Sequence, residues 1–159
     1  MKHTISALVK NRAGVLADSS AAFQKSGINI TSISCGETEN MEVSRMVICA
    51  EGSEEDMTTV TKELLEMDFV IQLDDLARKD FVDRELVLIK VAVNKDSMSQ
   101  VMQIFEVFRA DVIGMGQNTI TAELSGDQER IDGLIKILEP LGIKSMCRTG
   151  MIALKRGDE

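Results

Sequence analysis

The 159-residue chain has no Trp and no Tyr, and it contains only one His and one Pro. Proteins that bind single-stranded nucleic acid stack bases on aromatic side chains, and phosphate contacts require Lys and Arg. Here aromatic residues make up 3% of the chain and the formal net charge is −8. The composition therefore argues against a nucleic-acid partner and favours a protein or a small molecule.

Long apolar runs are also missing. No stretch approaches the roughly 20 consecutive apolar residues that a membrane-spanning helix needs. The N-terminal sequence MKHTISALVKN lacks the apolar segment and small-residue cleavage site of a secretory signal. We therefore expect no membrane association and a cytoplasmic location.

The cysteines show no metal-site spacing. Cys35, Cys49 and Cys147 are far apart in strand-like segments, and His3 is distant from all of them in sequence. No nucleophile lies beside a base in the sequence. We expect the cysteines to be buried, reduced thiols that act as small apolar side chains, and His3 to be structural. The sequence predicts no metal site and no catalytic residues.

Two periodicities divide the chain into helices and strands. Helical spacing of apolar residues appears at 15–23, 57–67, 101–108 and 131–138. Strand-like runs lie at 4–9, 28–35, 43–51, 69–73, 86–93, 112–115, 119–124 and 143–146. Helix boundary signals support this assignment: Gly27 follows the first helix, Ser53 with Asp56 resembles a capping box, and Asp127 precedes the fourth helix.

Each half of the chain thus reads strand, helix, strand, strand, helix, strand. This order predicts an α+β protein made of two ferredoxin-like βαββαβ domains, each with two helices on one face of a four-stranded antiparallel sheet. We place the domains at 1–78 and 79–159, with the charged stretch 74–83 as the junction. Because such sheets have free edges and one face without helices, we also expect the chain to form oligomers.

The segment with the clearest chemistry is Lys10-Asn11-Arg12-Ala13-Gly14-Val15-Leu16, which leads from the first strand into the first helix. A helix N-terminus offers free N–H groups to a carboxylate, and a glycine lets a ligand approach the backbone. Asn11 and Asn29 offer amides, and Val15, Leu16 and Ile30 offer an apolar wall. These groups match a free amino acid, although a glycine such as Gly14 is more often a turn residue and an asparagine such as Asn11 is more often a hydrogen-bonded loop residue.

The order strand, N-x-x-G-V-L, helix, S-G-I-N-I, strand resembles the ACT domain, a ferredoxin-like module that binds amino acids between two copies. Other segments are similar to the small subunit of acetolactate (acetohydroxyacid) synthase. They are Ser44-Arg45-Met46, the stretches 81–91 and 104–110, and the tail segments 148–150 and 155–158. The resemblance covers essentially the whole chain.

This resemblance implies a regulatory subunit that stimulates a separate catalytic large subunit and confers feedback inhibition by a branched-chain amino acid, usually valine. It also implies a homodimer, with valine held by Asn11, Gly14, Val15 and Leu16 of one chain and Asn29 and Ile30 of the other. Thiamine diphosphate, Mg and FAD are expected on the catalytic subunit, and no cofactor in this chain. The second domain lacks an N-x-x-G-V-L segment, so we assign it to partner contact and dimer support.

Three other functions fit the same fold. An acylphosphatase-like enzyme uses a loop arginine, and Arg12 lies in such a loop, but the longer phosphate-binding sequence is absent. An RNA-binding domain needs basic charge and aromatic residues on its open sheet face, which are missing. A free-standing ACT sensor of another pathway, such as glycine metabolism, shares the first pocket but does not require the second half to resemble the synthase subunit.

Overall fold

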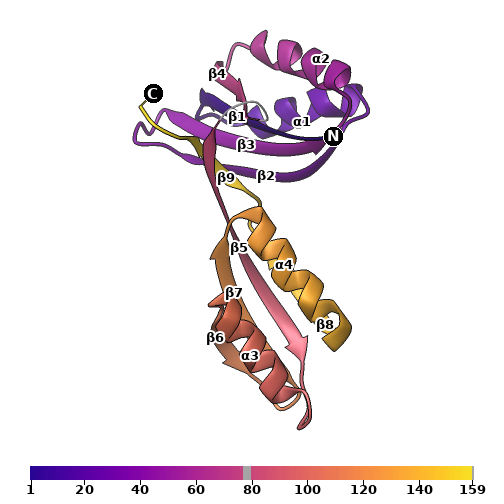
Figure 1. Ribbon diagram of the computed structural model, residues 1–159. Coiled ribbons are helices and arrows are strands. Elements are labelled where there is room, and N and C mark those ends of the chain that lie inside the picture. Colours follow the sequence, from indigo (N-terminus) through magenta and orange to yellow (C-terminus); the bar gives the residue numbers. More distant parts are fainter. Residues whose placement is uncertain (77–79, 159) are drawn as a thin grey trace. The chain divides into compact units, whose positions relative to one another are not determined.

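The computed structural model describes residues 1–76 and 80–158, which form two compact units (Figure 1). The first unit contains residues up to 82 together with the C-terminal segment from 151, and the second contains 83–150. The expected boundary between 78 and 79 lies outside the described residues. The sequence assigned 151–158 to the second domain, but the structure places this segment in the first unit, where Met151 and Ala153 are buried.

The first unit follows the predicted βαββαβ order. Its elements are β1 (Lys2–Lys10), α1 (Val15–Lys25), β2 (Asn29–Glu37), β3 (Val43–Glu51), α2 (Glu54–Leu65) and β4 (Val70–Asp75). The sheet is antiparallel with strand order β2-β3-β1-β4, so β2 and β4 are its edges. This is the ferredoxin-like topology that the sequence predicts.

Strand alternation places the main core of the first unit between the sheet and its two helices. Ile5 of β1 and Met46 of β3 point toward the helices and are fully buried there with Phe23 of α1 and Leu64 of α2. In Figure 1, α1 and α2 lie on the same side of this sheet. The amphipathic pattern of the sequence therefore determines which face the helices cover.

Two predicted helix signals act as expected. The Ser53 hydroxyl accepts a hydrogen bond from Asp56 N at 3.1 Å, which caps the start of α2. After α1, Gly27 adopts a positive φ of 66°, and Ile28 N donates to Phe23 O at 3.0 Å. Both arrangements satisfy backbone groups that a helix end leaves without partners.

The other face of the first sheet is covered by the C-terminal strand β9 (Ile152–Lys155), which the sequence analysis did not predict. Met151 and Ala153 are buried against Val47 and Leu76, with Phe81 packed beside them. Val47 lies next to Met46 on β3 and therefore points to the face opposite the helices. In Figure 1, β9 lies on the side of this sheet away from α1 and α2.

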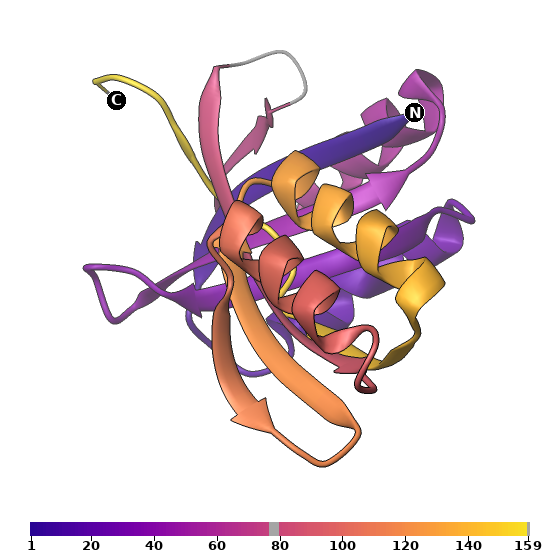
Figure 2. The same cartoon turned by 60° about the horizontal axis from the view of Figure 1, so that its bottom comes forward.

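The second unit repeats the same order with different residues. Its elements are β5 (Phe81–Ala92), α3 (Met98–Phe108), β6 (Asp111–Met115), β7 (Thr119–Gly126), α4 (Gln128–Leu138), a short 3-10 turn η2 (Glu139–Leu141) and β8 (Ile143–Arg148). The strand order is β6-β7-β5-β8, and β9 also pairs with β5. Figure 2 shows α3 and α4 next to each other, and their apolar faces enclose a core around Phe105, Ile131 and Leu134.

Within the predicted junction 74–83, β4 ends at Asp75 and β5 begins at Phe81. One expectation, the burial of the cysteines, is wrong in this structure. The cysteines are not all buried: Cys35 and Cys147 are exposed and Cys49 is half-buried. Cys35 lies on the edge strand β2, and Cys147 faces away from the helices on β8, so neither enters a helix-covered core.

Candidate functional site

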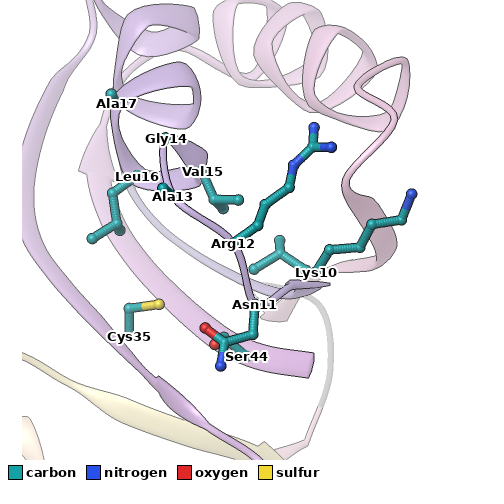
Figure 3. A pocket seen from close by; sticks show the side chains of 11 residues that line it. Lys10, Asn11, Arg12, Ala13, Gly14, Val15, Leu16, Ala17, Cys35 and Ser44 are labelled. Carbon is teal, nitrogen blue, oxygen red and sulfur yellow. The ribbon is translucent and has the colours of Figure 1, made fainter. Parts of the chain in front are cut away.

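The first unit contains a pocket of about 380 Å³ where β1 ends and α1 begins (Figure 3). Its wall combines the end of β1, the loop after it, the first turn of α1 and one residue each from β2 and β3. The lining residues are Val9, Lys10, Asn11, Arg12, Ala13, Gly14, Val15, Leu16, Ala17, Cys35 and Ser44. Four of the six predicted site residues are therefore brought together in one chain.

The N-terminus of α1 forms one side of this pocket. Gly14 occupies the N-cap position, and no side chain caps the helix. Asp18 N donates to Gly14 O at 2.9 Å, which begins the helical hydrogen bonding. The N–H groups of Val15, Leu16 and Ala17 precede this bond and have no partner within the helix. They give the pocket a positive end that suits a carboxylate.

Gly14 is required for its backbone conformation. Its φ is 90° and its ψ is −15°, in the left-handed region that side chains other than glycine rarely adopt. Space is not the constraint, since a Cβ at this position would meet only Asp18 Oδ2 at 3.9 Å. The turn interpretation of Gly14 and its place in the pocket wall are thus both correct.

Apolar side chains form another part of the wall. Val15 is buried, whereas Leu16 is 48% exposed at the pocket, so Leu16 does not join the helix stripe that contributes to the core. Cys35 lies across from Leu16 in Figure 3. Although Cys35 is open to solvent, partial burial raises the pKa of its thiol, which keeps it in the uncharged form at neutral pH. This wall matches an aliphatic side chain.

Asn11 joins the pocket to the hairpin between β2 and β3. Its Nδ2 donates to Met41 O at 2.9 Å and to Glu37 Oε1 at 3.2 Å, and its backbone N donates to Glu42 O at 2.8 Å. The amide nitrogen is thus the hydrogen-bonded loop group that the sequence left as an alternative. Among the described residues, none donates to Asn11 Oδ1.

Arg12 and Lys10 point away from Leu16 and Cys35 in Figure 3. The Arg12 guanidinium lies 2.6 Å from Asp68 Oδ1 and 5.7 Å from the centre of the Phe69 ring. An acylphosphatase-like site needs a loop arginine turned toward a bound phosphate. The geometry of Arg12 does not favour that alternative.

Asn29 and Ile30 do not line this pocket. They begin the edge strand β2, where Asn29 is exposed and pairs with Glu51, while Ile30 packs partly against the first core. The resemblance implies that these two residues come from a second chain, and that assignment stays a prediction.

Cys35 and Ser44 also line the pocket, although the sequence did not indicate them as site residues. Ser44 is buried on β3 and pairs with Val9 of β1, while Cys35 pairs with Met46. Only the register of the sheet brings these residues beside the loop after β1. Strand alternation in the sequence reveals faces but not register, so no local signal identifies them.

Two further properties concern only the described part of the chain. Across residues 1–76 and 80–158, no three His, Cys, Asp or Glu side chains are grouped as metal ligands. In the same residues, no helix is long and apolar enough to span a membrane.

The fold of the first unit is that of an ACT domain, and residues 5–72 match the description "AHAS small subunit-like ACT domain". Residues 84–157 match "Small subunit of acetolactate synthase". The chain therefore belongs to the acetolactate synthase small subunit family, as the resemblance in the sequence indicates.

Named members of this family are similar to the chain over almost its whole length. The chain is 37% identical over 155 residues to the acetolactate synthase small subunit of Mycobacterium bovis, covering 98% of this chain and 92% of the relative. It is 33% identical over 159 residues to a probable acetolactate synthase small subunit of Archaeoglobus fulgidus, covering 100% and 99%. The crystal structure of the Thermotoga maritima small subunit superimposes with a TM-score of 0.85 at 28% identity, covering 100% and 99%.

Proposed function

We propose that the chain is the regulatory subunit of acetolactate synthase in branched-chain amino acid biosynthesis. In this role it stimulates the catalytic large subunit and confers feedback inhibition by valine. The observation that carries the proposal is the match of both units, over essentially the whole chain, to proteins named as the small subunit of this enzyme. Thiamine diphosphate, Mg and FAD belong to the catalytic subunit in this proposal.

The pocket supports an amino-acid effector. The ligand carboxylate lies at the N-terminus of α1, beside Gly14, and the aliphatic side chain packs on Val15 and Leu16. Asn29 and Ile30 of a second copy complete the site. Valine is the proposed effector, with leucine and isoleucine weaker, since one methylene in an apolar pocket changes binding by roughly 1–3 kcal/mol.

A site shared by two chains explains how the effector acts at a distance. Because such a site is complete only in the paired state, ligand binding is linked to the geometry of the homodimer. A catalytic subunit that prefers one dimer geometry then responds to valine. The second unit, which has no N-x-x-G-V-L segment, contributes partner contact and dimer support in this proposal.

The alternative is a free-standing ACT sensor of another pathway, such as glycine metabolism. Such a sensor does not need a second unit of the synthase type, yet residues 84–157 match the small-subunit family. Co-purification with a thiamine-diphosphate-dependent catalytic subunit distinguishes the two functions.

The test is to reconstitute the full chain with the catalytic subunit and measure acetolactate formation with and without valine. We expect stimulation by the chain and inhibition by valine. Gly14→Asp and Gly14→Ala form a matched pair, because both place a Cβ on a backbone with a φ of 90°. Only the aspartate adds a negative charge beside the ligand carboxylate, so we expect its half-inhibitory valine concentration to rise at least about tenfold above that of Gly14→Ala.

Each possible failure has its own meaning. If the chain neither binds nor stimulates the catalytic subunit, the regulatory assignment is wrong. If both Gly14 variants respond to valine like the unchanged protein, the effector binds elsewhere. If the two variants lose the response equally, the helix N-terminus does not hold the carboxylate.

A further inference from the structure

The side chain of Asn11 has a defined orientation in the pocket. A carboxamide nitrogen carries two hydrogens, and here it has two acceptors, Met41 O at 2.9 Å and Glu37 Oε1 at 3.2 Å. Figure 3 shows the amide nitrogen directed away from Val15 and Leu16.

Both acceptors belong to a hairpin that is fixed by its own hydrogen bonds. Thr38 N donates to Val43 O at 3.0 Å, and Glu42 N donates to the Asn40 side chain at 3.0 Å. The Thr38 hydroxyl adds a bond to Val43 O, also at 3.0 Å. The hairpin backbone, which supplies Met41 O and positions Glu37, is therefore preorganised.

The remaining polar atom of Asn11 is its carbonyl oxygen, to which no described residue donates. An oxygen of this kind accepts a hydrogen bond from an ammonium but repels a carboxylate. The N-terminus of α1 at Gly14 has the opposite preference, because its N–H groups attract a carboxylate and repel an ammonium. The two groups together define the direction of an amino acid in the pocket, with its carboxylate at the helix and its ammonium at Asn11.

We propose that Glu37 is a positioning residue that selects ligands with an α-ammonium group. A rotation of the Asn11 amide by half a turn would place its oxygen against the Glu37 carboxylate, and two acceptors facing each other repel. Glu37 thereby holds the oxygen toward the ligand. This inference rests on the proposed function of the pocket as an amino-acid site, and it adds a residue that lies behind the pocket wall.

The experiment compares two ligands on the full-length protein. L-Valine has an ammonium at its α-carbon, whereas 2-hydroxy-3-methylbutanoate has a hydroxyl there and is otherwise the same. Glu37→Ala removes the acceptor, and Glu37→Gln retains an oxygen acceptor without the charge. Glu39→Ala is the matched control, because Glu39 is an exposed glutamate of the same hairpin with no bond to Asn11.

In Glu37→Ala we expect the preference for valine over the hydroxy acid to fall by about three- to tenfold, the range that one lost hydrogen bond represents. Glu37→Gln should restore part of that preference, and Glu39→Ala should leave it unchanged. A merely structural role for Glu37 would weaken both ligands equally.

Other results would overturn the inference. An equal loss for both ligands, an unchanged preference in Glu37→Ala, or the same loss in Glu39→Ala each contradicts it. Failure of the unchanged protein to bind valine is a different outcome, since it removes the proposed function itself and this inference with it. If the unchanged protein binds valine normally and Glu37→Ala keeps the same preference for valine over the hydroxy acid, only the role proposed for Glu37 is wrong.

Discussion

At the scale of single residues, the second unit contains a buried carboxylate that the sequence does not reveal. Glu85 is 6% exposed, and its two oxygens accept bonds from Arg148 Nε and Nη2, both at 2.7 Å. Arg148 Nη1 also lies 2.9 Å from Asp132 Oδ1. A buried charge without a partner is costly, so this pairing is what allows Glu85 to occupy β5.

We predict that replacing Arg148 lowers the unfolding free energy more than replacing Glu85. Arg148→Met leaves the buried Glu85 carboxylate without its cation and should cost about 3 kcal/mol of unfolding free energy. Glu85→Gln keeps an acceptor for Arg148, which retains Asp132, and should cost about 1 kcal/mol. Urea denaturation of both variants measures the difference, and equal losses would contradict the prediction.

The pH dependence of this pair follows from Arg148. The hydrogen bonds that Arg148 donates to the Glu85 carboxylate raise the pKa of Arg148 above its usual value, with burial acting in the opposite direction. A raised folded-state pKa gives stabilisation that is complete below the unfolded-state pKa and lost only as the pH rises through the folded-state pKa. Because an arginine side chain stays protonated throughout this range, its contribution should be equal at neutral and mildly alkaline pH.

At the scale of elements, the C-terminal segment with β9 buries part of the face of the first sheet that the helices do not cover. Val47 of β3 is 2% exposed because Met151 and Ala153 lie on it. Lys155 Nζ also contacts Asp74 Oδ2 at 2.7 Å, which connects the same strand to β4. The C-terminal segment thus takes part in the core of the first unit, although the whole second unit separates this segment from the rest of the first unit in sequence.

We predict that alanine substitutions at two adjacent residues of this segment lower the unfolding free energy by very different amounts. Met151 is 7% exposed and Ile152 is 58% exposed. Met151→Ala should lower the unfolding free energy by about 2–3 kcal/mol by leaving a cavity, whereas Ile152→Ala should stay within about 0.5 kcal/mol. Chemical denaturation, with hydrogen exchange of the β3 amides, checks both values. Similar losses in the two variants would show that β9 does not pack as described.

The same elements show how far the sequence predicts the fold. Ser53 and Asp127 act as helix caps as expected, because a cap depends on residues within one turn. The strand β9 was missed because four residues give little periodicity, and its partner Val47 is distant in sequence. Burial of Cys35 was expected from its apolar neighbours, but its position on an edge strand depends on the strand order.

For the candidate site, the sequence predicted the residues that are close together in the chain. Asn11, Gly14, Val15 and Leu16 adjoin one another in the chain, and a strand followed by a helix necessarily places them at one turn. The orientation of the Asn11 amide was not predictable, because it depends on Glu37, a hairpin residue 26 positions later in the chain.

At the scale of the whole molecule, the proposed site takes Asn29 from a second copy of the chain. It lies on β2, and β2 is an edge of the first sheet with its outer backbone groups available for pairing. Leu16 at 48% and Ile33 at 38% exposure are apolar side chains on α1 and β2. These features support a homodimer in which each copy completes the pocket of the other.

This arrangement predicts that two variants that cannot bind valine as homodimers regain valine binding when they form a mixed dimer. Gly14→Asp and Asn29→Ala should each abolish valine binding in their own homodimers. In a mixed dimer, the unchanged Gly14 loop of one chain faces the unchanged Asn29 of the other, so one of the two sites is intact.

The measurement is calorimetric titration of valine after the two variants are unfolded together and refolded. Random pairing makes about half of the dimers mixed, with one site each, so the mixture should bind about a quarter as much valine per chain as the unchanged protein. The separately refolded variants, combined without exchange of chains, should bind none. If each pocket were complete within one chain, the refolded mixture would also bind none, and if Asn29 took no part, Asn29→Ala alone would bind normally.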